Sequence, residues 1–174
     1  MPSKERGDFE YLIAQPIWHG QKLKTLLTHV ELAGYNRELI NWQLDDKIYR
    51  DFVSSPIIEP STLNLQPSTS LNWRRPLWEE FYPRIRHESS PDDAAKIVVR
   101  HLRERVTIAN APNLSHDIPE IWLRQITDEA GFEIIYVAAL RSVGVPARLD
   151  SHQQAEFWDG DSWRTAPSPS VISW

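Results

Sequence analysis

The stretch that decides the fold runs from Thr127 to Arg148 and reads T-D-E-A-G-F-E-I-I-Y-V-A-A-L-R-S-V-G-V-P-A-R. Its middle is almost wholly apolar, so the pattern predicts a helix over 128–143 that is buried nearly all round. Asp128 suits the helix cap, and the carboxylate of Glu129 complements the positive end of the helix dipole. Gly144, followed by a proline, predicts the end of the helix. The sequence therefore indicates a core built around one central helix.

The segments on either side predict several helices first and a small antiparallel sheet last. After 143 the chain reads A-R-L-D, A-E-F-W-D-G-D and S-W-R-T-A-P, and the second and third segments predict a hairpin with Asp159-Gly160 at the turn. This order predicts an α+β fold. We expect helices over 20–34, over 36–53 with Asn36 as its cap, and over 91–106 after Ser90. A short helix is expected around 76–82, and Pro83 ends or bends it. We expect loops over 54–72 and 107–117, and a short helix or turn over 118–126.

Composition narrows the class of protein. The formal net charge of −5 argues against nucleic acid or an anionic membrane as the main partner. No apolar run is long enough for a membrane span, and the charged N-terminus lacks the apolar core of a signal peptide. The chain has no cysteine, which excludes disulfides, thiolate metal sites and thiol catalysis. The six histidines are scattered without metal-ligand spacing, so we expect no metal and no cofactor.

The segment V-A-A-L-R-S-V-G-V-P-A-R (137–148) resembles the end of the central helix and the following strand of the transglutaminase-like superfamily, which shares the papain-type cysteine-enzyme core. In that family Gly-x-Cys opens the helix and Gly-Ile-Pro-Ala-Arg closes it. The likeness covers roughly the last 50 residues, from Trp122 onward. A second, short likeness, A-G-Y-N-R-E-L at 33–39, is to large extracytoplasmic bacterial proteins that carry degenerate domains of this type. Together they imply a bacterial, extracytoplasmic domain of a larger protein.

The resemblance also locates the positions where the family has its catalytic residues. The cysteine position falls on Glu129, the histidine position on His152, and the orienting aspartate position near Ala166 or Pro167. The cysteine and the aspartate are thus absent, so the resemblance implies a degenerate active site, a pseudoenzyme. Glu129 has a structural interpretation as a helix-dipole residue, and His152 as a solvated loop residue.

Binding is the other role that the residues suggest. Trp158 and Trp163 lie on the predicted hairpin, where they share a face if the turn is at Asp159, and exposed they would mark a binding patch. Packing in the core is the structural alternative for both. Arg148 is a candidate ligand for an anion or a substrate carboxylate, and the alternative is an ion pair with Asp150 or Glu133.

Three hypotheses follow. The first is a non-catalytic transglutaminase-like module that binds an extended peptide or a glycan in a remnant cleft. The second is a hydrolase or acyl transferase of altered chemistry, with Glu129 and His152 as a carboxylate–imidazole pair. The third is a structural spacer that contacts the other domains of the parent protein. In each, 1–72 forms a helical N-terminal extension or linker region, and 73–174 forms the transglutaminase-like domain or its C-terminal part.

Overall fold

The computed structural model describes residues 3–14, 21–58 and 71–168, and its helices and two small sheets confirm the α+β class. The helices are α1 (Ser3–Ile13), α2 (Gln21–Arg37), α3 (Asp46–Tyr49), the π-helical turn η1 (Arg50–Ser54), α5 (Arg74–Ile85), α6 (Pro91–Arg105), α7 (Ile118–Arg124) and α8 (Glu129–Ser142). The strands are β1 (Thr107–Ile108), β2 (Ile126–Thr127), β3 (Ala147–Leu149), β4 (Ala155–Trp158) and β5 (Trp163–Thr165).

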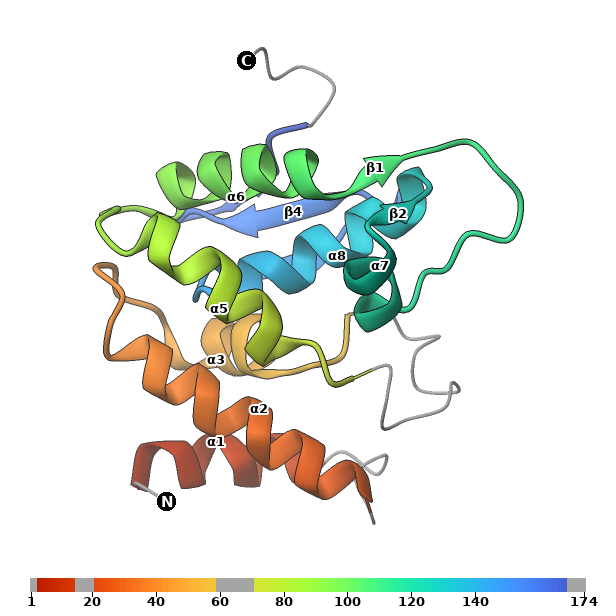
Figure 1. Cartoon of the computed structure of the whole chain (residues 1–174). Helices are drawn as coiled ribbons and strands as arrows, with labels where there is room; N and C mark the ends of the chain where they lie inside the picture. Colours follow the sequence, from red (N-terminus) through yellow and green to blue (C-terminus); the bar gives the residue numbers. More distant parts are fainter. Residues whose placement is uncertain (1–2, 15–20, 59–70, 169–174) are drawn as a thin grey trace.

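Helix α8 is the centre of the molecule, as predicted (Figure 1). Every residue from Ile134 to Ser142 is buried, because α5, α6, α7 and η1 pack around the helix together with β3 and β4. Gly144 follows the helix with a φ of +90°, a conformation that suits glycine. Its carbonyl accepts a hydrogen bond of 3.0 Å from Trp42 Nε1, which joins the N-terminal region to the end of α8. The predicted boundary between 72 and 73 stays a prediction.

The three-stranded sheet has the order β3-β4-β5 and is antiparallel throughout. Ala155 and Phe157 are buried toward α8, so the side chains that alternate with them point to the other face of the sheet. The predicted hairpin with its turn at Asp159 is confirmed. The Asp159 carboxylate accepts backbone hydrogen bonds of 2.8 Å and 2.9 Å within that turn.

A two-stranded parallel pair, β1 with β2, lies in a region expected to contain only loops and a helix or turn. The pair forms because Ala109 N and Thr107 N donate to the carbonyls of Thr127 and Gln125, at 2.8 Å and 2.9 Å. Gln125 ends α7 in the left-handed conformation with a φ of +61°, which directs the chain into β2. The parallel pair places the start of α8 beside the segment that follows α6.

The predicted boundaries at the N-terminal end are wrong in two places. Helix α2 continues through Gly34 and Asn36 to Arg37, and the next helix begins only after Asp45. Asn36 is buried inside α2, where its side-chain oxygen accepts a 2.9 Å hydrogen bond from Trp78 Nε1 instead of capping a helix. Asp45 provides the cap through its carboxylate. Helix α1 was not expected, and α5 continues two residues past Pro83.

Arg74, at the start of α5, is a charged residue within the core, with 2% of its surface exposed. Its Nε donates to His29 Nδ1 at 2.8 Å, so His29 is the neutral tautomer that has its proton on Nε2. Its Nη atoms donate to the carbonyls of Arg141, Val53 and Ser54, at 3.1 Å, 2.6 Å and 3.2 Å. One guanidinium therefore connects α2, η1, α5 and α8.

Arg141 is buried beside Arg74, and its guanidinium also donates hydrogen bonds to backbone carbonyls. Its guanidinium donates to the carbonyls of Ser55, Ile57 and Ala147, at 2.8 Å, 2.7 Å and 2.9 Å. Burial lowers the pKa of Arg74 to about 10 and that of Arg141 to about 9, so both remain charged at neutral pH. Across the described ranges, neither forms an ion pair with a carboxylate, and their hydrogen bonds go to backbone carbonyls and, for Arg74, to the neutral His29 ring.

Candidate functional site

The first turn of α8 is held in place by side chains on both sides of it. The Asp128 carboxylate caps the helix by accepting from Gly131 N at 2.8 Å, and the same oxygen lies 2.7 Å from His116 Nε2. Thr127 is buried and donates to the carbonyl of Ser115 at 2.9 Å. A Cβ at position 131 would lie 1.8 Å from the Thr127 hydroxyl, so this approach requires glycine.

Glu129, the first residue of α8, is exposed and lines a groove over the N-terminal end of the helix. The groove consists of two hollows, of about 590 Å³ and about 380 Å³, which share Glu129 and Ile108 as lining residues. The first hollow extends along Ala109 and Asn110, after β1. We call these two hollows the α8 groove. Glu129, which the resemblance aligns with the family's cysteine, therefore lines an open groove.

The second hollow extends from Glu129 toward the sheet. Glu133 lines it, and its carboxylate accepts a 2.8 Å hydrogen bond from Ala155 N at the start of β4. Burial raises the pKa of Glu133; this hydrogen bond opposes the shift, and the charges of Asp150 and Glu129 add to it.

The pKa of Asp128 lies below its usual range. Partial burial raises this pKa, but the hydrogen bonds from Gly131 and His116 lower it by more. Asp128 and Glu129 therefore bring negative charge to the groove, and Arg103 lines it as a cation.

The structure also locates the residues that the resemblance aligns with the family's histidine and aspartate. His152 is exposed in the turn between β3 and β4, where its ring lies 3.4 Å from Ser151 Oγ. In the described residues, no hydrogen bond or ion pair joins His152 to Glu129. Ala166 is buried and Pro167 accepts a 3.0 Å hydrogen bond from Tyr136 through its carbonyl, so both have backbone roles.

His116 is the histidine that contacts the first turn of α8, and the sequence did not single it out. It lies in the loop before α7, and the β1–β2 pair returns that loop to the helix start. The only sequence signal is a lone histidine in a polar loop, which does not reveal its partner Asp128 twelve residues later. The pair is a carboxylate–imidazole contact, partly exposed on both sides.

Trp158 and Trp163 pair directly across β4 and β5, so they share one face of the sheet as predicted. Their ring centroids are 5.6 Å apart. This face points away from α8, and Phe52 of η1 packs against Trp163 with ring centroids 4.7 Å apart. The two tryptophans are partly buried and do not line the α8 groove.

Arg148 lies on the same face of the sheet. Its guanidinium stacks 3.9 Å from the centroid of the Trp163 ring, and its Nε donates to the Glu156 carboxylate. The expected scaffold partner was Asp150 or Glu133, so that part of the prediction is wrong. The reason is the strand register, which places Arg148 directly opposite Glu156. Its role as a ligand for an anion stays a prediction.

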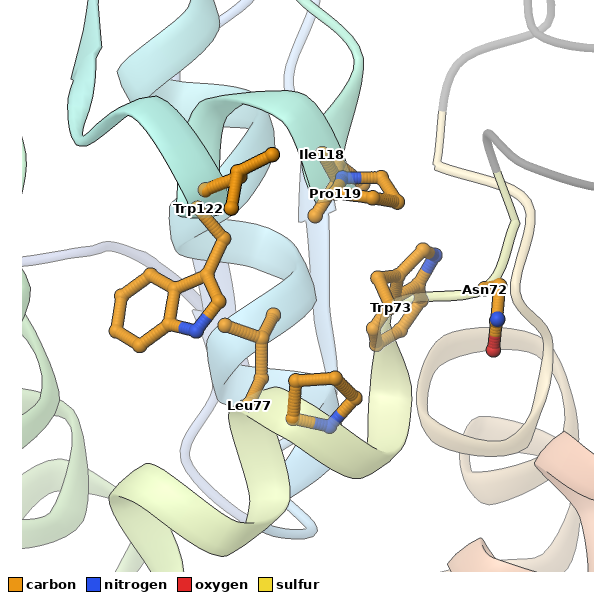
Figure 2. Close-up of a pocket in the computed structure, with 8 residues that line it drawn as sticks. Asn72, Trp73, Leu77, Ile118, Pro119 and Trp122 are labelled. Atoms are coloured by element: carbon orange, nitrogen blue, oxygen red, sulfur yellow. The ribbon is translucent and has the colours of Figure 1, made fainter.

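A separate apolar pocket of about 290 Å³ lies between α5 and α7 (Figure 2). Trp73 and Leu77 belong to the start of α5, and they face Ile118, Pro119 and Trp122 of α7. None of the described residues that line it is titratable, so these residues provide no groups for acid–base chemistry.

Within the described ranges, no cluster of three or more potential metal ligands is present, and no helix has the length and apolarity needed to cross a membrane. Comparison of this chain with models of protein families, with curated proteins and with solved structures finds no match. The transglutaminase-like resemblance therefore stays a prediction that rests on residues 137–148.

Proposed function

We propose that this chain is a non-catalytic, transglutaminase-like module of a larger bacterial protein, and that it binds an extended peptide in the α8 groove. The observation that carries the proposal is the position of Glu129. It lies at the first turn of the central helix and lines an open groove, in a chain that has no cysteine. Without a cysteine nucleophile, the groove can still bind an extended peptide across the N-terminal end of α8.

The charges of the groove favour a peptide with a basic side chain. Glu129 is exposed, and Asp128 lies beside it with its pKa lowered, so both can accept hydrogen bonds from a lysine or arginine. Peptide is favoured over glycan because the stacking surfaces that a sugar needs, Trp158 and Trp163, lie on the face of the sheet that points away from α8.

A selection from a random peptide library tests this proposal, with a glycan array run in parallel. We expect the wild-type protein to select peptides enriched in lysine or arginine, and Glu129→Lys to lose that binding. Glu104→Lys is the matched control, because Glu104 is exposed on α6 and does not line the groove. Equal selection by both variants, or no selected peptide, would contradict the proposal and favour a structural spacer.

The catalytic alternative is tested by incubating the protein with peptide amides and esters and measuring hydrolysis or amine transfer. The alternative requires turnover that disappears in both Glu129→Gln and His152→Ala. We expect no turnover above the uncatalysed rate, because Glu129 and His152 are not joined in the described structure and a carboxylate is a poor nucleophile for acyl transfer.

A further inference from the structure

A further cavity, of about 310 Å³, lies between α2 and the first turn of α5. Lys24 and Thr28 line it from α2, Arg74 and Arg75 line it from the first turn of α5, and Asn72 lines it from just before that helix. None of the described residues that line it is acidic. We call it the basic cavity. It shares no lining residue with the α8 groove, so it forms a separate site.

Two exposed cations, Lys24 and Arg75, line the mouth of the basic cavity. Lys24 is exposed and forms no ion pair in the part of the chain that the structure describes. Arg75 is 64% exposed at its side chain, and its contact with Glu79 on the next turn is long, at 3.6 Å. Because exposed pairs of this kind contribute little energy, an anion in the cavity can compete with Glu79 for the guanidinium.

The inner wall adds positive charge that has no ion-pair partner among the described residues. Arg74 forms this wall together with His29, and Arg141 lies behind them in the core. Carbonyl oxygens and, for Arg74, the His29 ring accept the hydrogen bonds of the two guanidinium groups, yet neither group forms an ion pair with a carboxylate among the described residues. Because charge interacts strongly in the poorly polarisable interior, this wall favours an anion in the cavity.

The N-terminal end of α5 also favours an anion in the cavity. The helix has 12 residues, and its cap residue, Trp73, accepts no hydrogen bond through its side chain. The amides of the first turn are therefore not capped by that residue, and the helix dipole adds positive potential at this end.

We propose that the basic cavity binds the phosphate group of a small soluble phosphate monoester. Lys24 and Arg75 hold the phosphate oxygens at the mouth, the Asn72 amide adds a donor, and Arg74 supplies the field from the inner wall. Phosphate is favoured over carboxylate because two exposed cations and a buried one line the cavity, and phosphate carries more charge and more acceptor oxygens. The cavity is much larger than a water molecule, which leaves room for the group that bears the phosphate.

Thermal unfolding of the whole chain tests the proposal, at constant ionic strength set with chloride. The probes are inorganic phosphate, glycerol phosphate and acetate. We expect phosphate and glycerol phosphate to raise the Tm of the wild-type protein with saturation, and acetate to raise it less. Lys24→Gln and Arg75→Gln should each weaken the apparent Kd by about tenfold, the scale of one charged hydrogen bond.

Arg84→Gln is the matched control, because Arg84 is exposed on the same helix, contacts a glutamate one turn away and lies outside the cavity. It should bind phosphate like the wild type. Arg74 is left unchanged in this test, since its replacement threatens the fold. A Tm that does not respond to phosphate, an equal response in all three variants, or an equal response to acetate would overturn the proposal. A response to inorganic phosphate without one to glycerol phosphate would overturn the monoester assignment.

Discussion

Replacement of Arg74 by methionine should strongly destabilise the protein. Methionine is close in length but has no donor, so four acceptors lose their hydrogen bonds: His29 Nδ1 and the carbonyls of Arg141, Val53 and Ser54. All four lie in the interior, where water does not replace the lost donor.

The size of the effect follows from these contacts. Each lost hydrogen bond costs about 1 kcal/mol, and an orphaned buried acceptor costs somewhat more. Removal of the buried charge returns part of this, because the guanidinium no longer has to be desolvated. We therefore expect Arg74→Met to lower the free energy of unfolding by about 3–5 kcal/mol, a large fraction of the stability of an ordinary domain.

Urea unfolding followed by circular dichroism and tryptophan fluorescence measures this loss. Arg75→Met is the matched control, because Arg75 is the next residue of the same helix and its side chain is 64% exposed. The control should differ from the wild type by less than about 0.5 kcal/mol. If Arg74→Met is as stable as Arg75→Met, the buried hydrogen-bond network does not hold η1 and α2 against α5 and α8.

Three further outcomes are expected. Glu129→Ala should lower the free energy of unfolding by at most about 1 kcal/mol, the scale of a helix-dipole contact, and a loss several times larger in urea unfolding would show that Glu129 is part of a buried network. Ala139→Trp should prevent folding, because Ala139 is fully buried on α8 and the core has no room for an indole, so a cooperative thermal transition in this variant would contradict the central position of α8. Stability should fall as the pH drops below about 6.5, since burial, followed by the charge of Arg74, places the pKa of His29 well below its usual range. The unfolded chain then takes up the proton first, at a cost of up to about 1.4 kcal/mol per pH unit. In urea unfolding at several pH values, His29→Gln should flatten the dependence of the free energy of unfolding on pH between pH 7 and pH 5. The same dependence in the variant and the wild type would contradict this role of His29.

The parts of the fold that the sequence predicted are those with local causes. Helix α8 was predictable because its apolar run, the cap at Asp128 and the stop at Gly144 all lie within one segment. The hairpin was predictable because Asp159-Gly160 favours a tight turn between alternating strands.

The parts that were missed depend on partners far along the chain. Asn36 looked like a helix cap, but it bonds Trp78, which is 42 residues away. The burial of Arg74 and Arg141 gave no signal in the sequence, because arginine is seldom fully buried and their carbonyl partners meet them only in the folded chain.

The candidate site also has one part that the local sequence predicts and another part that depends on distant residues. The position of Glu129 at the helix start was predictable from α8 alone. The walls of the groove, such as Ile108 and Gln154, come from the β1 region and the turn before β4, so their place beside Glu129 depends on tertiary packing. The contact of His116 with Asp128 likewise depends on the parallel β1–β2 pair, which has only two residues in each strand and left no periodic signal.

The most direct test of peptide binding in the α8 groove is an NMR titration of the labelled protein with a basic peptide from the library selection. The amide shifts should change at 108–110, at 128–133 and at Gln154, with little change at Trp158 and Trp163. Shifts confined to the two tryptophans, or to the apolar pocket between α5 and α7, would contradict the proposed site, and no shift at saturating peptide would contradict peptide binding altogether.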